Sequence, residues 1–248
     1  MKSIVLIILL FLSVFFKLSA QNLAGEITYE KVMRYTRLYS QLTFLTKEEK
    51  DRMKMTWGNK DENTWNMKLY FSDNKSLYTY PSESENDGSY SWNKTDYRIY
   101  RDYEAEKHTD IIEMVGKTYI IEDSIVAPKW KVMNKIKEIA GYMCMMAVTE
   151  DTIKKQKITA WFADNLPLST GPEQYGGLPG LIMELDFNDG DIVITAKKVE
   201  LKVIAEEIGV PKKLKGKRVT NQQYDMLVYN HIKDSMKAHR NPYWSMPY

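Results

Sequence analysis

The segment from Leu181 to Val203 constrains the fold most, because it has the pattern of a β-hairpin with one buried face. Apolar and polar residues alternate in its first half, and the turn-forming sequence NDGD follows at residues 188–191. In the second half the apolar positions change phase near Lys197-Lys198. Because a slip of one residue exchanges the two faces of a strand, this change predicts a β-bulge and a bend in the sheet.

Similar short stretches of β-forming residues occur along most of the chain. Strands are predicted over residues 25–33, 65–71, 76–80, 97–103, 117–122, 129–132 and 141–148. Short polar segments join them, which is typical of an antiparallel meander and not of alternating strands and helices. We therefore expect a mainly β fold of the α+β class, a curved antiparallel sheet or half-barrel with a carboxyl-terminal helix packed on it.

Two capping boxes predict where helices begin. Thr46 and Glu49 precede a short charged helix that should end near Met55, and Thr220 and Gln223 precede a second helix. One face of the second helix carries Tyr224, Leu227, Val228, His231 and Ile232, so this helix is expected to pack on the sheet. The lysine-rich segment over 204–219 favours a solvated connection over a basic docking patch, and residues 82–88 favour an exposed loop.

The amino terminus has the pattern of a cleavable secretory signal over residues 1–20. Lys2 precedes an apolar run at 4–16, and the sequence LSA at 18–20 suits signal peptidase. The run is shorter than the ~20 residues that span a bilayer. We expect an exported protein in the periplasm, at the outer membrane or outside the cell, with a single β-rich domain over 21–240 and a flexible or latching tail over 241–248.

Charge and cysteine content exclude two classes of protein. Without Lys2 and Lys17, the 35 basic residues become 33 and equal the 33 acidic ones. A neutral chain lacks the surplus of cations with which proteins bind nucleic acid. Cys144 is the only cysteine, so no internal disulfide is expected and the fold must rely on its core.

Residues for catalysis or metal binding are sparse. The three histidines have no metal-binding spacing, and no Gly-x-Ser-x-Gly elbow is present. His108 and Asp110 would suit an orienting pair, but the charge run around them favours solvent exposure. Cys144 lies among methionines that suit Cu(I), yet strand alternation separates their sulfur atoms, so a buried core strand is expected. We predict no catalytic residue, metal or cofactor; a carboxylate pair across a cleft would be a tertiary feature.

The most unusual motif is the sequence GGLPGLI at residues 176–182. Pro179 fixes its own φ and Gly180 can adopt a positive φ, so residues 178–181 predict a type II turn that leads into the hairpin. A phosphate-binding loop would need a Lys and a Ser or Thr at the start of a helix. Here a strand follows the glycines, which excludes that interpretation.

This motif closely resembles the signature of the GLPGLI family of exported bacterial proteins. The likeness continues through ITAWF at 158–162, LPL at 166–168 and GYMC at 141–144, with a departure at Met145-Met146. It covers most of the chain after residue 20 and is most specific over about 119–201. The resemblance implies a β-rich envelope protein of Gram-negative bacteria without an established enzymatic activity. The chain also looks like the half-barrel of periplasmic lipoprotein carriers, a fold-level analogy that does not carry function.

These observations predict a non-enzymatic binding or assembly protein that offers an apolar concave sheet face to an envelope protein, a peptide or an amphiphilic ligand such as a lipid. Its ligand or partner surface is expected at Trp161, Tyr175, Leu178, Pro179 and Leu181. A third interpretation makes the turn at 178–181 an assembly surface, which requires Leu178 and Leu181 to be exposed.

An alternative of another class is a glycan-acting enzyme or a carbohydrate-binding module that uses the aromatic residues over 57–103. Aromatic rings can stack on sugars, although their commonest use is in a core. The alternative predicts at least two coplanar, exposed rings among Trp57, Trp65 and Trp92.

Overall fold

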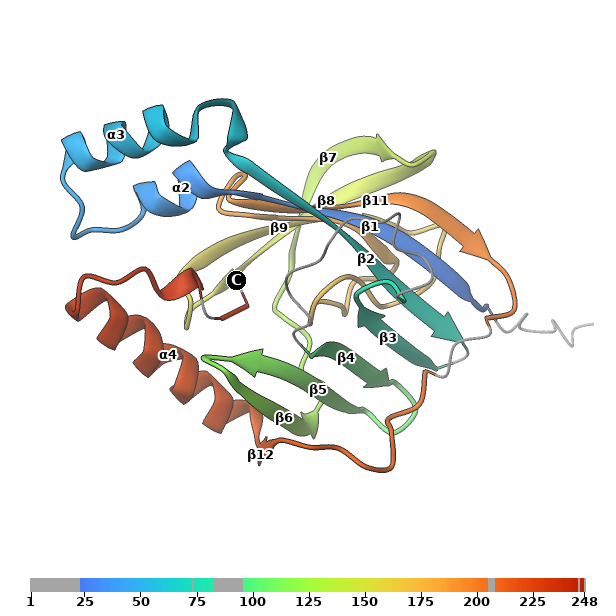
Figure 1. The fold of residues 1–248 in the computed structure, drawn as a ribbon. Helices are drawn as coiled ribbons and strands as arrows, with labels where there is room; N and C mark the ends of the chain where they lie inside the picture. Colours follow the sequence, from blue (N-terminus) through green and yellow to red (C-terminus); the bar gives the residue numbers. More distant parts are fainter. Residues whose placement is uncertain (1–22, 73, 83–95, 205–207, 245, 248) are drawn as a thin grey trace, which may run out of the picture.

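One curved sheet dominates the protein in a computed structural model, which describes residues 23–72, 74–82, 96–204, 208–244 and 246–247 (Figure 1). The described strands lie in the order β12-β6-β5-β4-β3-β2-β1-β11-β10-β9-β8-β7. All neighbours pair antiparallel except β12 and β6, which are parallel. The sheet stays open between β12 and β7, so the predicted half-barrel class is confirmed. The predicted signal over 1–20 lies outside the described residues.

Most elements follow one another with short connections, whereas residues 164–180 between β9 and β10 and residues 202–216 between β11 and β12 form long ones. The strands are β1 (Gly25–Arg34), β2 (Glu62–Ser72), β3 (Lys75–Thr79), β4 (Tyr97–Asp102), β5 (Lys107–Met114), β6 (Lys117–Ser124), β7 (Lys131–Ile139), β8 (Tyr142–Asp151), β9 (Gln156–Ala163), β10 (Leu181–Phe187), β11 (Ile192–Leu201) and β12 (Lys217–Val219). The helices are α2 (Tyr35–Ser40), α3 (Lys47–Trp57) and α4 (Asn221–Lys237), with 3-10 turns η1 (Gly58–Lys60) and η3 (Pro242–Trp244). Strands β5, β9 and β12 were not among the predicted ones.

The predicted hairpin and its bulge are confirmed. Strands β10 and β11 pair around a turn in which Asn188 and Asp189 both have positive φ. On β11, Lys198 pairs with Thr28 of β1 whereas Ala196 pairs with Tyr29. Lys197 is therefore the extra residue, which accounts for the change of phase seen in the sequence.

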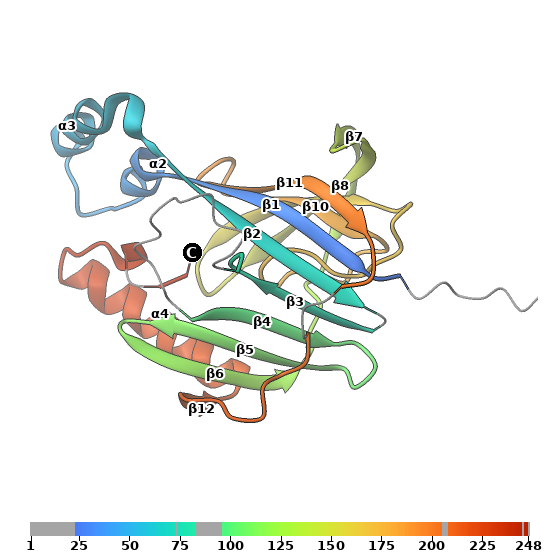
Figure 2. The same ribbon diagram turned by 45° about the vertical axis from the view of Figure 1, so that its right-hand side comes forward.

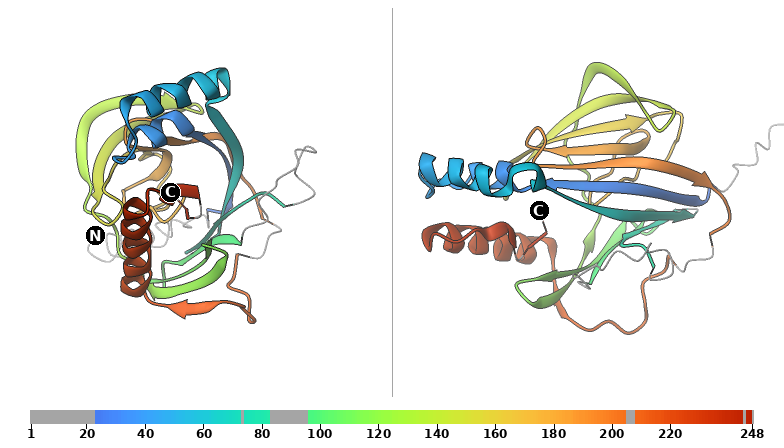
Figure 3. Two further views of the ribbon diagram at one scale, coloured as in Figure 1. Left: turned by 60° about the vertical axis from the view of Figure 1, so that its left-hand side comes forward. Right: turned by 45° about the horizontal axis from the view of Figure 1, so that its top comes forward.

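Both predicted capping boxes are present at the starts of α3 and α4. Helix α4 packs along β6, where the rings of Tyr224 and Tyr119 meet edge to face with centroids 5.9 Å apart. Helices α3 and α4 project from the same end of the sheet (Figure 3, right). No helix among the described residues combines the length and the apolar character needed to cross a bilayer.

The core fills the concave side of the sheet, across which α4 and the chain end lie (Figure 3, left). The sheet register places Ile27 and Tyr29 of β1 beside Leu69 and Met67 of β2 and Ala196 of β11, all buried. A smaller cluster lies on the convex side and consists of Tyr70, Leu77, Tyr100 and Ile111.

The connection after β11 covers that smaller cluster. Ile204, Ile208 and Leu214 pack against it, whereas Lys212 and Lys213 are exposed. The segment predicted as a solvated connection is therefore solvated at its lysines and packed at its apolar residues.

Candidate ligand-binding cavity

The connection between β9 and β10, residues 164–180, folds onto the concave face of the sheet. Backbone hydrogen bonds hold it there: Leu181 N–H donates to Leu166 O over 2.9 Å, and Ile182 N–H donates to Thr170 O over 3.0 Å. Tyr29 adds a hydrogen bond of 2.7 Å from its hydroxyl to the carbonyl of Ile182. This connection supplies one wall of the cavity described below.

The glycine motif works differently from the prediction. Gly180 does not have a positive φ, so the predicted type II turn at 178–181 is wrong; the positive φ of 82° belongs to Gly177. Gly180 is required by close approach, since a Cβ there would lie 2.1 Å from the carbonyl oxygen of Ala163. The motif thus lets two backbone segments touch.

A cavity of about 330 Å³ lies between the concave face of β2–β4 and the segment 169–177. Its volume is in the range of sites for one small ligand. Apolar walls come from β2–β4 and from residues 125–128. The lining residues with apolar or aromatic character include Leu69, Tyr78, Ile99, Ile125, Val126 and Tyr175. The polar ones include Ser76, Arg101, Glu106, Thr170, Glu173 and Gln174.

The segment 125–130 closes the cavity on one side, where residues 125–128 belong to its lining. This segment connects β6 with β7, two strands that lie near opposite ends of the open sheet. Trp130 anchors it: its indole N–H donates to Gly176 O over 2.8 Å, and its ring meets Tyr175 edge to face. A Cβ at Gly177 would lie 2.5 Å from Ala127 Cβ. The cavity wall is therefore tied to the glycine motif at three neighbouring points.

Arg101 is the cation of the cavity, and buried groups behind it fix its position. Its guanidinium binds both carboxylate oxygens of Asp110, and His108 Nδ1 lies 3.3 Å from Asp110 Oδ2. Burial acts to raise the pKa of Asp110, but Arg101 and His108 outweigh it and hold that pKa below its usual value.

The predicted solvent exposure of His108 and Asp110 is wrong. Their exposed fractions are 7% and 4%. Both lie in β5, on the same face as Ile112 of the core. Pairing of Ile99 with Asp110 and of Arg101 with His108 brings the compensating cation from the neighbouring strand.

Glu173 is the buried anion of the cavity. Lys31 Nζ donates to Glu173 Oε1 over 2.7 Å, Tyr78 Oη lies 3.5 Å from the same oxygen, and Tyr97 Oη contacts Oε2. Burial raises the pKa of both tyrosines, and the Glu173 charge adds to the rise. Glu173 itself has a φ of 56°, a conformation that non-glycine residues adopt only where surrounding contacts hold it.

A second, smaller space of about 40 Å³ lies beyond Glu173, towards α4. Glu173, Gln174 and Tyr175 line both spaces. Lys154 also lines the smaller one, and burial lowers its pKa against the opposing effect of Asp151. The chain from 173 to 175 thus forms a partition with charged groups on its far side.

The structure does not bring the five predicted surface residues together. Tyr175 lines the cavity, but Leu178 and Leu181 are buried in the core and Pro179 is exposed. Trp161 alternates with core residues on β9 and faces the other way, with Lys137 Nζ 4.4 Å from its ring centroid. The burial of both leucines removes the reason to treat the turn as an assembly surface.

Two other sequence hypotheses can be placed. Trp57 and Trp65 are both half-buried, and Trp57 stacks on Tyr35 with centroids 4.8 Å apart; Trp92 lies outside the described residues. The described tryptophans therefore offer no pair of exposed coplanar rings. Cys144 is fully buried, as expected for a core strand, and burial raises the pKa of its thiol to about 11.

Sequence reasoning missed Arg101, Glu173 and the wall at 125–128. Arg101 alternates with Tyr97 and Ile99 on β4, which is a signal that its side chain shares their face. Glu173 lies in a segment without periodicity, so no local pattern marks it.

Comparison with known proteins adds a coarse family relationship and a fold. A family model described as "Protein of unknown function (Porph_ging)" matches residues 149–184, which include the partition and the whole glycine motif. This region is similar to that family. No curated protein matches the chain.

Two solved structures of PNGF-II, in the P21 and C2 space groups, match this chain with TM-scores of 0.56 and 0.55. The matches cover 83% and 87% of this chain at 14% sequence identity. They cover 33% of the PNGF-II chain in each case, so the present chain spans about a third of its length. At this identity the likeness shows the fold alone.

Proposed function

We propose that the protein is a non-enzymatic binding protein of the cell envelope that holds a small amphiphilic ligand in the 330 Å³ cavity. The cavity carries the proposal, because apolar walls and a few fixed polar groups are what such a ligand needs. Leu69, Ile99 and Ile125 would contact the apolar body of the ligand. Arg101 and the hydroxyl of Thr170 would contact its polar head.

The state of the charged groups supports binding over catalysis. Arg101 is held by Asp110, and Glu173 is held by Lys31 and two tyrosines. Groups fixed by buried partners suit recognition, because little conformational entropy is lost when the ligand binds. A general acid or base would need a proton-accepting or proton-donating atom that is not already committed to such partners.

We further propose that the chain is a member of the GLPGLI family and is exported to the envelope. Two observations support this: the family match at 149–184 overlaps the motif at 176–182, and residues 1–20 have the pattern of a secretory signal. Expression with this segment in a Gram-negative host tests export. Recovery of a periplasmic or secreted form that begins near Gln21 is expected, and an uncleaved cytoplasmic form would contradict it.

The binding proposal is tested by titrating the purified protein with decanoate in a calorimeter. The Gln174→Trp variant places a large ring at an exposed position of the cavity lining and is expected to weaken binding at least tenfold. The matched control is Gln222→Trp, at an exposed position of α4, and should bind as the original chain does. Equal binding by both variants, or no binding of decanoate, would contradict the proposal.

The polar part of the lining favours a second candidate, recognition of a saccharide in the same cavity. Tyr103, Glu106 and Gln174 add hydrogen-bonding groups to those of Arg101 and Thr170, and such groups match sugar hydroxyls. The same titration with di- and trisaccharides separates the candidates. Saccharide binding that is lost in Gln174→Trp, without decanoate binding, would favour the carbohydrate-binding alternative.

A further inference from the structure

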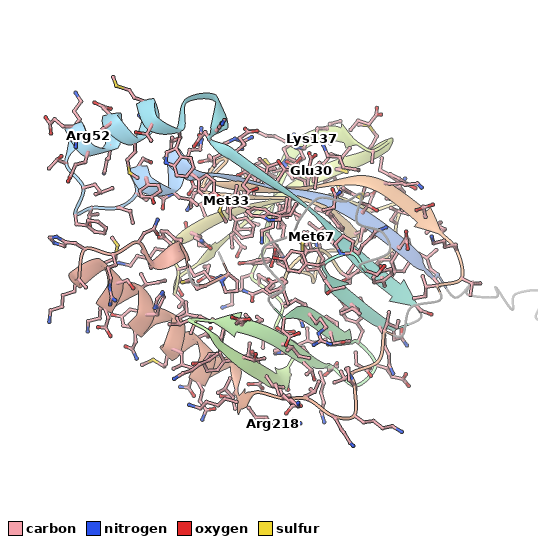
Figure 4. The ribbon with its side chains drawn as sticks, viewed as in Figure 1. Glu30, Met33, Arg52, Met67, Lys137 and Arg218 are labelled. Atoms are coloured by element: carbon pink, nitrogen blue, oxygen red, sulfur yellow. The ribbon has the colours of Figure 1, made fainter. Side chains whose placement is uncertain are left out.

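A cluster of cations lies on β7 and the segment before it. Lysines occupy positions 129, 131, 135 and 137, and no acidic residue occurs between Ile125 and Lys137. Lys129, Lys131 and Lys135 are exposed. Lys137, labelled in Figure 4, pairs instead with Glu184, with Nζ 2.5 Å from Oε1. Three exposed cations remain on this part of the chain, and the nearest acid in sequence is the exposed Glu138, which pairs with Met143.

Exposed apolar side chains accompany these lysines. The exposed fractions of Val126, Val132, Ile136 and Met143 are 77%, 53%, 67% and 53%. Val132 pairs with Ala147. The register shifts after Met133, where residues 134 and 135 have no partner on β8, so that Ile136 pairs with Met145. Val132 and Ile136 therefore lie on the same face of the β7–β8 hairpin, at the free edge of the sheet.

We propose that this β7 surface, residues 126–137 with Met143, docks the protein on an anionic lipid bilayer. Lysines that flank exposed aliphatic side chains suit the boundary between lipid headgroups and acyl chains. The surface also adjoins the cavity, because Val126 belongs to both and Trp130 ties the segment to Gly176. Docking would place the cavity beside the membrane, from which an amphiphilic ligand could enter. The inference therefore extends the proposed function, but the β7 surface could bind a bilayer whatever the cavity holds.

A second group of lysines provides a natural comparison. Lys212, Lys213 and Lys215 are exposed before β12, on the opposite side of the molecule from β7 (Figures 1 and 2). Their apolar neighbours Ile208 and Leu214 pack against the convex cluster. This group thus has comparable charge, and Val210, 43% exposed, is its single exposed aliphatic side chain among the described residues 208–216.

Co-sedimentation with vesicles tests the charge part of the proposal. The protein is purified in its exported form, and its mass is verified by mass spectrometry. It is then mixed with vesicles of phosphatidylcholine that contain 30% phosphatidylglycerol, or with vesicles of phosphatidylcholine alone. Binding is expected only to the anionic vesicles and should weaken in 0.5 M NaCl. The triple variant Lys129→Glu, Lys131→Glu and Lys135→Glu should lower the affinity on the order of a hundredfold, since each lysine contributes roughly fivefold. The control Lys212→Glu, Lys213→Glu and Lys215→Glu should change it little.

The apolar part has its own matched pair of variants. Val132→Ser with Ile136→Ser should weaken binding to anionic vesicles, whereas Leu201→Ser with Val203→Ser, also exposed, should not. The inference is overturned if anionic vesicles are not bound, or if either control loses as much affinity as its β7 counterpart. Loss of vesicle binding with intact decanoate binding removes this inference alone. Loss of decanoate binding with intact vesicle binding removes only the proposed ligand.

Discussion

Lys31 on the first strand donates to Glu173, 142 residues further along the chain, over 2.7 Å, and the side chains are 14% and 5% exposed. The pair fastens the segment 164–180 to the concave face of the sheet. Tyr78 and Tyr97 contact the same carboxylate from β3 and β4. Because a buried charge is costly without a partner, this arrangement fixes where the cavity wall lies.

Removing the cation of this pair should be strongly destabilising. Lys31→Met leaves Glu173 buried without its opposite charge, and we expect a loss of about 3–5 kcal/mol in the free energy of unfolding. Lys31→Met combined with Glu173→Gln should recover a large part of it, because no buried charge remains. Urea unfolding followed by tryptophan fluorescence measures all three proteins.

The matched control is the exposed pair of Lys157 and Asp189, with Nζ 2.8 Å from Oδ1. Lys157→Met should have little effect, since solvent screens exposed ion pairs. Similar losses in Lys31→Met and Lys157→Met, or a double variant weaker than Lys31→Met alone, would contradict the argument.

Gly180→Ala should be costly for a reason of space. Its Cβ would lie 2.1 Å from a backbone oxygen, so two segments must separate, and we expect a loss of about 2–3 kcal/mol. Gly141→Ala is the comparison: its φ is 83° and nothing lies near the added atom, so only conformational strain of about 1 kcal/mol is expected. Chemical denaturation compares the two, and an equal or smaller loss at Gly180 would show that the wall yields easily.

Local patterns were sufficient for the elements whose cause is local. The capping boxes at Thr46 and Thr220 need only residues three positions apart, and both helices begin where predicted. The bulge at Lys197 follows from a change of phase within one strand. In each case the residues that determine the structure are neighbours in the sequence.

The site depends on contacts that no local pattern contains. The sequence does not predict β5, because the charged residues around His108 are typical of an exposed segment. Asp110 can be buried there because its compensating cation, Arg101, comes from the neighbouring strand β4. The partner of Glu173 lies on the first strand. The unusual motif around Leu178 predicts a binding surface, whereas in the structure this motif serves close packing in the core.

The thiol of Cys144 should be unreactive in the folded protein. It is fully buried, and burial raises its pKa to about 11, so the reactive thiolate is scarce at neutral pH. Labelling with Ellman's reagent is expected to be slow in buffer and complete in denaturant. A Ser124→Cys variant, at an exposed position, should label one thiol rapidly in buffer. Comparable rates for the two thiols in the folded state would contradict the burial of Cys144.

Folding disfavours the ionised form of the Asp186 carboxyl group. Burial raises its pKa to about 6, although the backbone N–H of Gly190 acts to lower it. Its Oδ1 is buried and has no hydrogen-bond partner in the described part of the chain. An unfolded aspartate has a pKa of about 3.9, so between these two values the folded chain holds a proton that the unfolded chain has released.

The stability contributed at Asp186 should therefore fall as pH rises from about 4 to 6, because the folded state binds more protons in this window. Asp186→Asn cannot ionise and escapes that loss, so its stability relative to the original chain should improve by about 1 kcal/mol between pH 4 and pH 7, since partial exposure reduces the full effect. Urea unfolding at pH 4, 5.5 and 7 measures this difference, in which other titrating groups cancel. Asp51→Asn, at an exposed position of α3, should show no trend. A difference that stays constant, or changes in the other direction, would show that Asp186 ionises freely in the folded protein.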